Sequence, residues 1–202
     1  HAGVARVVAA MSDPNPLVAG KGFRRLQDAG IAVVAPLMAP EAEALNVGFV
    51  QRMRTGSPWV RLKMAGSLDG RSALANGQSQ WITGPDARRD GHRYRARAQA
   101  ILTGVGTLMA DDPQLTVRDV PGPIGQNTGQ PLVLTPPLRV VLDSHLRMPL
   151  NARILQGGCL IATASTDVEK TRALQAAGAE IVVVPDANGR VDLAALLTHL
   201  AQ

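Results

Sequence analysis

The chain has 202 residues, of which 46% are hydrophobic and 18% charged, and its formal net charge is +5 at pH 7. This length suffices for one large domain, or for one domain and part of another, and the hydrophobic share allows a full core. No apolar run approaches the roughly 20 residues of a membrane-spanning helix, and no signal peptide is visible. The single cysteine, Cys159, excludes a disulfide framework and favours a reducing cytoplasm.

The first part of the chain starts at His1 and runs directly into an apolar stretch. We therefore expect a piece of a longer protein, with a partner domain upstream. Apolar periodicity predicts strands over residues 4–11 and 31–37, and helices over residues 20–30 and 40–56.

A new unit is expected from residue 57. The alternation in WVRLKMA predicts a strand over residues 59–65, and a polar, glycine-containing loop follows at residues 67–84. We expect a helix from about Thr83 to Gln99, a strand with a glycine-rich turn over residues 100–106, and a short helix then an extended piece over residues 107–118.

The rest of the chain alternates between strands and helices after a Pro/Gly-rich surface loop at residues 121–137. Strands are predicted at residues 139–144, 157–165 and 179–186, and helices at 167–178 and 192–201. This order predicts an α/β fold with a mostly parallel sheet, in which ligands collect at the carboxyl ends of the strands. The segments KMAGSLDGR, TGVGT and LDSH lie at such ends.

The densest basic stretch is ARRDGHRYRARAQ, residues 87–99, with five arginines. As a helix it places Arg88, His92, Arg95 and Gln99 on one face, and Arg89, Arg93 and Arg97 on another. A solvated helix face and a phosphate-binding face both fit this pattern. Nucleic acid is a weak interpretation, because the chain has only two Trp, one Tyr and two Phe on which bases could stack.

A metal or triad mechanism finds no support in the sequence. Zinc needs about four clustered ligands, whereas the chain has one Cys and four scattered His. No serine lies in a GxSxG-like elbow. If the protein is an enzyme, we expect its reactive group to come from a cofactor.

Three stretches carry a family resemblance: DPNPLVAGKG (13–22), EALNVGFVQRMRTGSPWVRLKMAGSLDGRSALANGQSQWITG (43–84) and AILTGVGTLMADDPQLTVR (100–118). They closely resemble the bifunctional riboflavin-biosynthesis proteins, in which a pyrimidine deaminase is fused to a pyrimidine reductase. The resemblance implies that residues 1–56 are the C-terminal part of a cytidine-deaminase-like α/β domain. Residues 57–202 would be a dihydrofolate-reductase-like reductase domain, incomplete at its C-terminus.

The resemblance also implies the residues of the site. Those that contact NADPH are Ala65, Trp81, Thr107, Asp111 and, less securely, Ser144. Those that contact the phosphoribosylated pyrimidine are Ser79, Arg95, Leu115 and Arg118, and Lys63 is the candidate catalytic group. Structural roles stay open for several of these: packing for Trp81, a turn cap for Asp111, and solvated positions for Arg118 and Lys63.

The resemblance thus implies NADPH-dependent reduction of the ribose of 5-amino-6-(5-phosphoribosylamino)uracil in the cytoplasm, by a homo-oligomer that binds neither nucleic acid nor membranes. Zinc-binding motifs of the deaminase are missing from this sequence, so we expect no stoichiometric zinc here. A glycine-rich segment that follows the last helix in the family is also missing, and a chain that ended at Gln202 should be inactive. A stand-alone reductase acting before deamination, a basic nucleic-acid-binding module and a non-catalytic scaffold are the alternatives.

Overall fold

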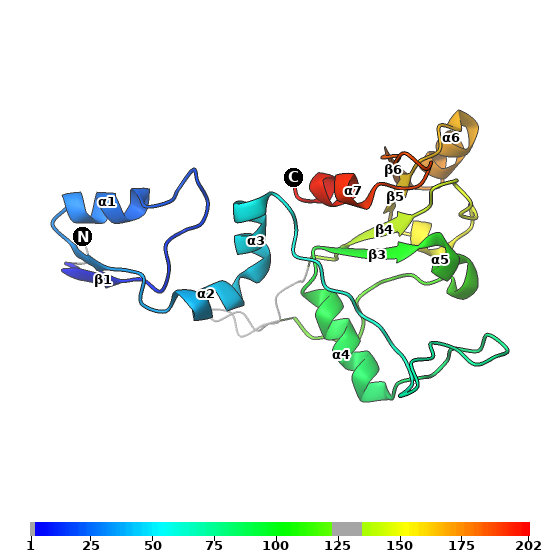
Figure 1. Ribbon diagram of the computed structural model, residues 1–202, viewed down its shortest axis with the longest axis horizontal. Coiled ribbons are helices and arrows are strands. Elements are labelled where there is room, and N and C mark those ends of the chain that lie inside the picture. Colours follow the sequence, from blue (N-terminus) through cyan, green and yellow to red (C-terminus); the bar gives the residue numbers. More distant parts are fainter. Residues whose placement is uncertain (1–2, 123–134) are drawn as a thin grey trace. The chain divides into compact units, whose positions relative to one another are not determined.

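The computed structural model describes residues 3–122 and 135–202, and the chain divides into two compact units (Figure 1). The first unit comprises His1–Arg61 and Leu197–Gln202, and the second comprises Leu62–Leu196. The domain boundary expected between residues 56 and 57 stays a prediction. Among the described residues, every helix is too short or too polar to cross a membrane.

The first unit contains a small parallel sheet and three helices. Strand β1 (Arg6–Val8) pairs with β2 (Ala32–Val34), and α1 (Lys21–Asp28) connects them. The single helix predicted over residues 40–56 is wrong, because the structure has α2 (Ala39–Leu45) and α3 (Val47–Thr55) with a break at Asn46. The side-chain amide of Asn46 donates to the Ala42 carbonyl at 3.0 Å. Asparagine competes with helix backbone bonds in this way, which explains the break.

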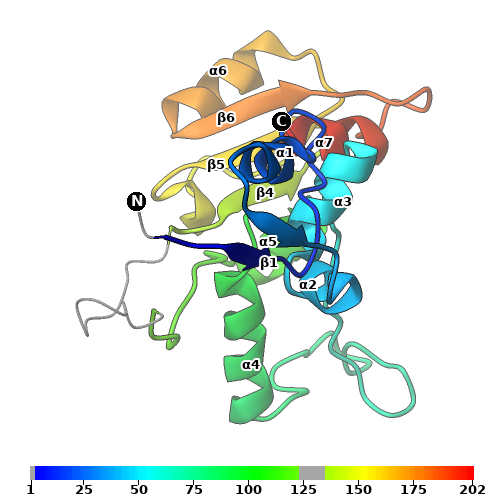
Figure 2. The ribbon, with the colours of Figure 1, turned by 90° about the vertical axis from the view of Figure 1, so that its left-hand side faces the viewer.

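The second unit is built on a parallel sheet in the order β3-β4-β5-β6, of which β4 to β6 can be followed in Figure 2. Its strands are β3 (Ala100–Gly104), β4 (Leu138–Leu142), β5 (Cys159–Thr163) and β6 (Ala179–Val183). The helices are α4 (Pro85–Ala96), α5 (Val105–Asp111) and α6 (Val168–Ala176), with a 3-10 turn at Arg153–Leu155. Helix α7 (Leu193–Leu200) begins in this unit, and its residues from Leu197 onward are assigned to the first. The predicted α/β class with a mostly parallel sheet is confirmed.

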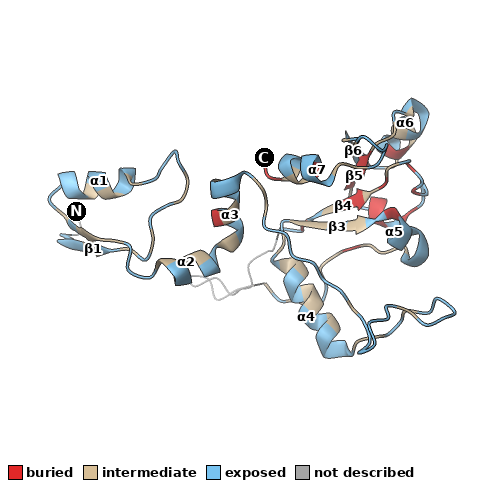
Figure 3. Cartoon of the chain, viewed as in Figure 1, coloured by how far each residue is buried: buried red, intermediate tan, exposed pale blue. Residues whose placement is uncertain are grey.

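The core of this unit lies along the central strands. All of β5 is buried, and Val140, Val141, Ile154 and Ile161 are fully inaccessible to solvent (Figure 3). A parallel strand covered on both faces is expected to show such a continuous apolar run. The carboxyl ends of β3 and β4 meet at one edge, since Gly104 aligns with Leu142.

The strand predicted over residues 59–65 is not formed. No strand of the described residues pairs with this segment, and Leu62 and Met64 are 81% and 80% exposed. Alternation of apolar residues supplies one face of a strand, but the hydrogen bonds must come from a neighbour. The prediction of a glycine-rich turn after β3 is also wrong, because α5 begins directly at Val105. Most of the loop predicted at 121–137 lies outside the described residues.

Candidate active site

Helix α4 presents two different basic faces, as its sequence predicts. Arg88, His92 and Arg95 are partly buried, whereas the arginines of the opposite face are exposed. Arg89 and Arg93 form ion pairs with Asp86 and Asp90 at 3.0 and 3.8 Å. The interpretation as a solvated helix face therefore fits only the outer face, with Arg89, Arg93 and Arg97. The inner face, with Arg88, His92 and Arg95, is available for specific contacts.

The segment that follows α5 turns sharply. Asp112, Leu115 and Asp119 have φ angles of 40°, 53° and 56°, in the left-handed region that non-glycine residues seldom adopt. Each such residue costs on the order of 1–3 kcal/mol and persists only where other contacts hold it. Leu115 and Arg118 are both expected to contact the substrate. The structure has the left-handed residue at Leu115 itself, and its side chain is buried in the core while Arg118 is exposed.

Four contacts fix alternate residues of this segment. The Asp112 carboxylate accepts from the Arg153 N–H at 2.8 Å, and the Gln114 carbonyl accepts from Arg139 at 3.2 Å. The next two contacts come from α4: Arg95 Nη1 donates to the Thr116 carbonyl at 3.2 Å, and His92 Nδ1 accepts from the Arg118 N–H at 3.0 Å. The inner face of α4 therefore holds the part of the segment that bears Arg118.

Arg95 bonds to the segment that carries Arg118, since it donates to the Thr116 carbonyl two residues before Arg118. Burial, and then the charge of Arg118, lower the pKa of Arg95 from its ordinary value. Within the described part of the chain, neither arginine forms an ion pair with a carboxylate. Two neighbouring guanidinium groups repel each other, and an anion that bridges them removes this cost. The resemblance names both among the four substrate-contacting residues, and the structure places them on two segments that are bonded to each other.

His92 is the site residue that the resemblance did not supply. Burial lowers its pKa, and the charges of Arg95 and Arg118 lower it further, whereas Asp119 opposes them. Its neutral imidazole accepts from Arg118 through Nδ1, so Nε2 carries the proton. The helical spacing of Arg88, His92 and Arg95 was the signal in the sequence that could have identified it.

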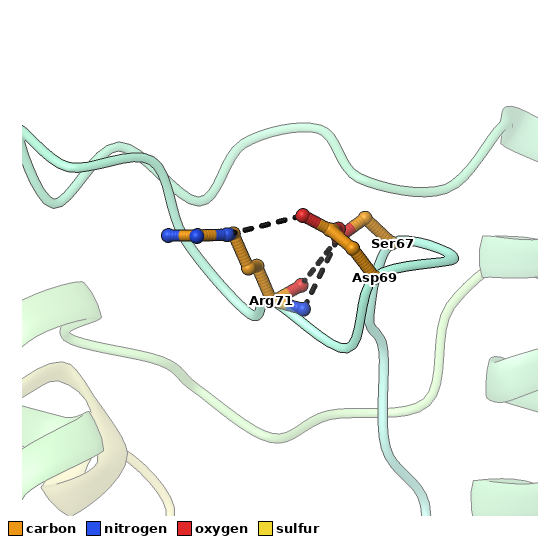
Figure 4. A network of polar contacts seen from close by, with 3 residues as sticks. All are labelled: Ser67, Asp69 and Arg71. Carbon is orange, nitrogen blue, oxygen red and sulfur yellow. Dashed lines mark hydrogen bonds and ion pairs between the residues drawn. The ribbon is translucent and has the colours of Figure 1, made fainter.

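The loop before α4 forms a second feature of the site, a hollow of about 420 Å³ lined by residues between Ser67 and Ile82, Ser79 and Trp81 among them. Its rim is a polar turn in which Ser67 donates to Asp69, and Asp69 pairs with Arg71 at 3.0 Å (Figure 4). The bond from Ser67 and then that from Arg71 lower the pKa of Asp69, so this carboxylate is charged at neutral pH.

Trp81 links this loop to α4. The Arg88 guanidinium lies 4.3 Å from the centre of the Trp81 ring, and its Nη1 donates to the Thr83 carbonyl at 2.6 Å. Trp81 is nevertheless 70% exposed. A purely packing role, the alternative that the sequence left open for Trp81, therefore describes it poorly. An exposed indole supported by a cation offers a flat apolar surface to a ligand ring.

The remaining predicted residues lie on separate elements. Thr107 and Asp111 are exposed on α5, and Ser144 follows β4 with its Oγ accepting from the Val191 N–H at 3.1 Å. Thr107 and Ser144 thus follow two neighbouring strand ends. Lys63 and Ala65 belong to the extended segment that lacks a strand partner, and no described contact joins them to Arg95 or Trp81.

A hollow larger than that of the loop lies at the amino ends of β4, β5 and β6, and its lining includes Ala96, Thr116 and Val117, the chain neighbours of Arg95 and Arg118. It measures about 730 Å³, and Leu115 is the one predicted site residue that lines it. Arg139 donates there to the carbonyls of Gln114, Gln156 and Gly158, which makes it a structural residue. Burial raises the pKa of the Cys159 thiol at this edge, so the thiol is protonated at neutral pH. Ligand sites of open parallel sheets lie at the opposite edge.

Comparison with known proteins identifies the family. The RibD C-terminal domain profile matches residues 58–202. The chain belongs to this family. Over its whole length it is 46% identical to the riboflavin biosynthesis protein RibD of Escherichia coli, of which it covers 54%. The chain thus spans about half the length of the curated relatives it matches.

Solved structures agree with this assignment. Form 1 of Acinetobacter baumannii RibD matches 98% of the chain with a TM-score of 0.82 and 40% identity, and the chain covers 51% of it. A Thermotoga maritima protein matches 98% of the chain with a TM-score of 0.79 and 28% identity, again with 51% of that protein covered. It is described as a diaminohydroxyphosphoribosylaminopyrimidine deaminase/5-amino-6-(5-phosphoribosylamino)uracil reductase. In the described residues of our chain, His, Cys, Asp and Glu form no group that could hold a metal.

Proposed function

We propose that this chain is the reductase part of a bifunctional riboflavin-biosynthesis protein, with the C-terminal part of the deaminase domain attached. The reaction is the NADPH-dependent reduction of the ribose of 5-amino-6-(5-phosphoribosylamino)uracil to its ribityl form. Family membership supports the reaction class, and the name of the Thermotoga relative supports the substrate. The observation that carries the proposal is that α4 holds the segment bearing Arg118: Arg95 donates to the Thr116 carbonyl, and His92 accepts from the Arg118 N–H.

The arginine pair suits the phosphate of such a substrate. Guanidinium groups bind phosphate oxygens through paired, charge-assisted hydrogen bonds, and they stay charged at physiological pH. Arg95 is positioned by its bond to Thr116, which leaves its other N–H groups free for a ligand. Ser79 and the backbone at Leu115 are proposed to contact the remainder of the substrate.

NADPH is proposed to bind across Trp81, Thr107, Asp111, Ser144 and Ala65. The exposed Trp81 ring and the two adjacent strand ends fit a dinucleotide, which needs a flat apolar surface together with polar groups at the sheet edge. When bound, NADPH supplies a hydride for the sugar carbon that carries the nitrogen. The chain's own task is to orient both molecules and to exclude water between them.

Lys63 is proposed to donate the proton that the ribose ring oxygen needs as the ring opens. It lies two residues before Ala65, on the proposed cofactor side. An ammonium group carries three N–H donors on a flexible stem, so it can follow the oxygen as the sugar changes shape. An ordinary surface lysine is the alternative.

Cofactor titration tests this function. NADPH and NADH are added to the chain with Trp59 replaced by Phe, so that Trp81 alone reports binding through its fluorescence. We expect clear preference for NADPH, whose additional phosphate suits a basic protein. Equal affinity for the two nucleotides would contradict the proposed cofactor, and steeply salt-dependent DNA binding would favour the nucleic-acid alternative. We also propose that the protein is a cytoplasmic homo-oligomer. Analytical ultracentrifugation measures its oligomeric state.

A further inference from the structure

We propose that His92 is a positioning residue for anion binding, because its Nδ1 atom holds the Arg118 backbone against the face of α4 that carries Arg95. The proposal rests on the proposed function, which assigns these two arginines to the substrate phosphate. His92 itself contacts no ligand in this scheme and acts through Arg118.

The backbone around Arg118 needs such a restraint. Leu115 and Asp119, on either side of it, are both left-handed, so the intervening residues are not held by any regular element. Of the contacts that fix residues 112–119, the bond from Arg118 N–H to His92 Nδ1, at 3.0 Å, is the one on Arg118 itself. Without this acceptor, the Arg118 N–H would lose its partner and the arginine would sample other positions, at an entropic cost to ligand binding.

His92 and Arg95 act together from one helix face. They lie three residues apart on α4, so their side chains are neighbours. Arg95 fixes the Thr116 carbonyl while His92 fixes the Arg118 N–H two residues later. The same helix therefore supplies one of the two cations and sets the place of the other.

Only the neutral imidazole can fulfil this role. Protonation would place an N–H at Nδ1, facing the N–H of Arg118, and two donors cannot bond to each other. The charged groups that face His92 are Arg95 on its own helix and Arg118 and Asp119 on the packed segment. Two of these three are cations and disfavour the imidazolium, whereas Arg88, one turn earlier, is engaged by Trp81.

The test compares His92→Leu, which removes the acceptor, with His92→Asn, whose amide oxygen replaces Nδ1 and does not titrate. Ribose 5-phosphate binding to the 202-residue chain is measured by calorimetry at pH 7.5. We expect His92→Leu to weaken binding about 3- to 10-fold, the range for the net contribution of one exposed hydrogen bond. His92→Asn should remain within about twofold of the unaltered chain, as should Arg93→Leu on the outer face.

A second measurement needs no variant that might fail to fold. The amide proton resonance of Arg118 in the unaltered chain should move upfield as pH falls through the titration of His92, and should stay in place in His92→Asn. An Arg118 resonance that ignores the titration, or equal affinity of His92→Leu and the unaltered chain, would overturn the role of His92 alone. An unaltered chain that binds no ribose 5-phosphate would overturn the arginine assignment too, while the NADPH titration separately decides the reductase function.

Discussion

Strand β5 has a continuous apolar run and residues 59–65 have an alternating one, and only β5 became a strand. β5 is buried at each of its positions and pairs with both β4 and β6. Residues 59–65 stay extended, with Leu62 and Met64 mostly exposed and no partner in the described part of the chain. The comparison teaches that an apolar pattern gives a segment the capacity to be a strand, whereas a neighbouring strand and a covering layer decide whether it becomes one.

The largest expected effect is a difference in the free energy of unfolding between a side-chain truncation in β5 and one in residues 59–65. Ile161→Ala in β5, at a fully buried position, should lower the free energy of unfolding by about 2–5 kcal/mol, because it leaves a cavity in the core. Leu62→Ala, at an 81% exposed position, should change it by less than about 0.5 kcal/mol. Urea unfolding of the two variants measures both. A comparable loss from Leu62→Ala would mean that residues 59–65 are covered in solution.

The same contrast between covered and solvated positions applies to the two faces of α4. Arg118→Ala, which removes one cation next to the inner face, should weaken ribose 5-phosphate binding about 10- to 150-fold, the range for a charge-assisted hydrogen bond. Arg118→Lys should restore part of the affinity if the contact is bidentate. Arg93→Ala on the outer face is the matched control and should leave binding unchanged. NADPH affinity should stay the same in all three variants. If Arg118→Ala weakened NADPH binding and left ribose 5-phosphate binding unchanged, Arg118 would belong to the cofactor site and not to the substrate site.

Two exposed tryptophans sharpen the comparison for the loop. Trp81→Ala should weaken NADPH binding about 5- to 30-fold, toward the lower end of what a ring stacked on an aromatic side chain contributes. Trp59→Ala, at a residue 51% exposed in the other unit, should leave the NADPH dissociation constant unaltered. Isothermal calorimetry measures both. Equal losses in the two variants would remove the reason for assigning Trp81 to the cofactor.

The smallest expected effect is a pH dependence of stability from His92. Its pKa in the folded chain lies below the ordinary value of about 6.5. As pH falls below about 6.5, the unfolded chain therefore takes up the proton first, and the stability of the folded chain decreases until the lower, folded pKa is passed. Thermal unfolding between pH 7.5 and 5 measures this effect. The loss of stability over that range should be smaller in His92→Asn than in the unaltered chain. An identical decrease in both chains would show that other groups cause it.

Sequence alone determined the α/β class and most of the elements. β3 to β6 and the helices α4, α6 and α7 follow from apolar periodicity and from helix signals such as Pro85, because these signals are local. The two faces of α4 also followed from helical geometry. The resemblance named Arg95 and Arg118 among the substrate residues, and the structure holds the segment of Arg118 against the helix that carries Arg95.

Other features depended on contacts between residues far apart in the chain, which no local pattern contains. Residues 59–65 form no strand because no described strand pairs with them. The break at Asn46 is different, because its side chain bonds to Ala42 only four residues earlier, a local effect that apolar periodicity does not show. His92 became a site residue through a contact 26 residues away along the chain, the bond that its Nδ1 accepts from the Arg118 N–H. Periodicity fixes which face a residue occupies, but only packing in three dimensions decides what that face meets.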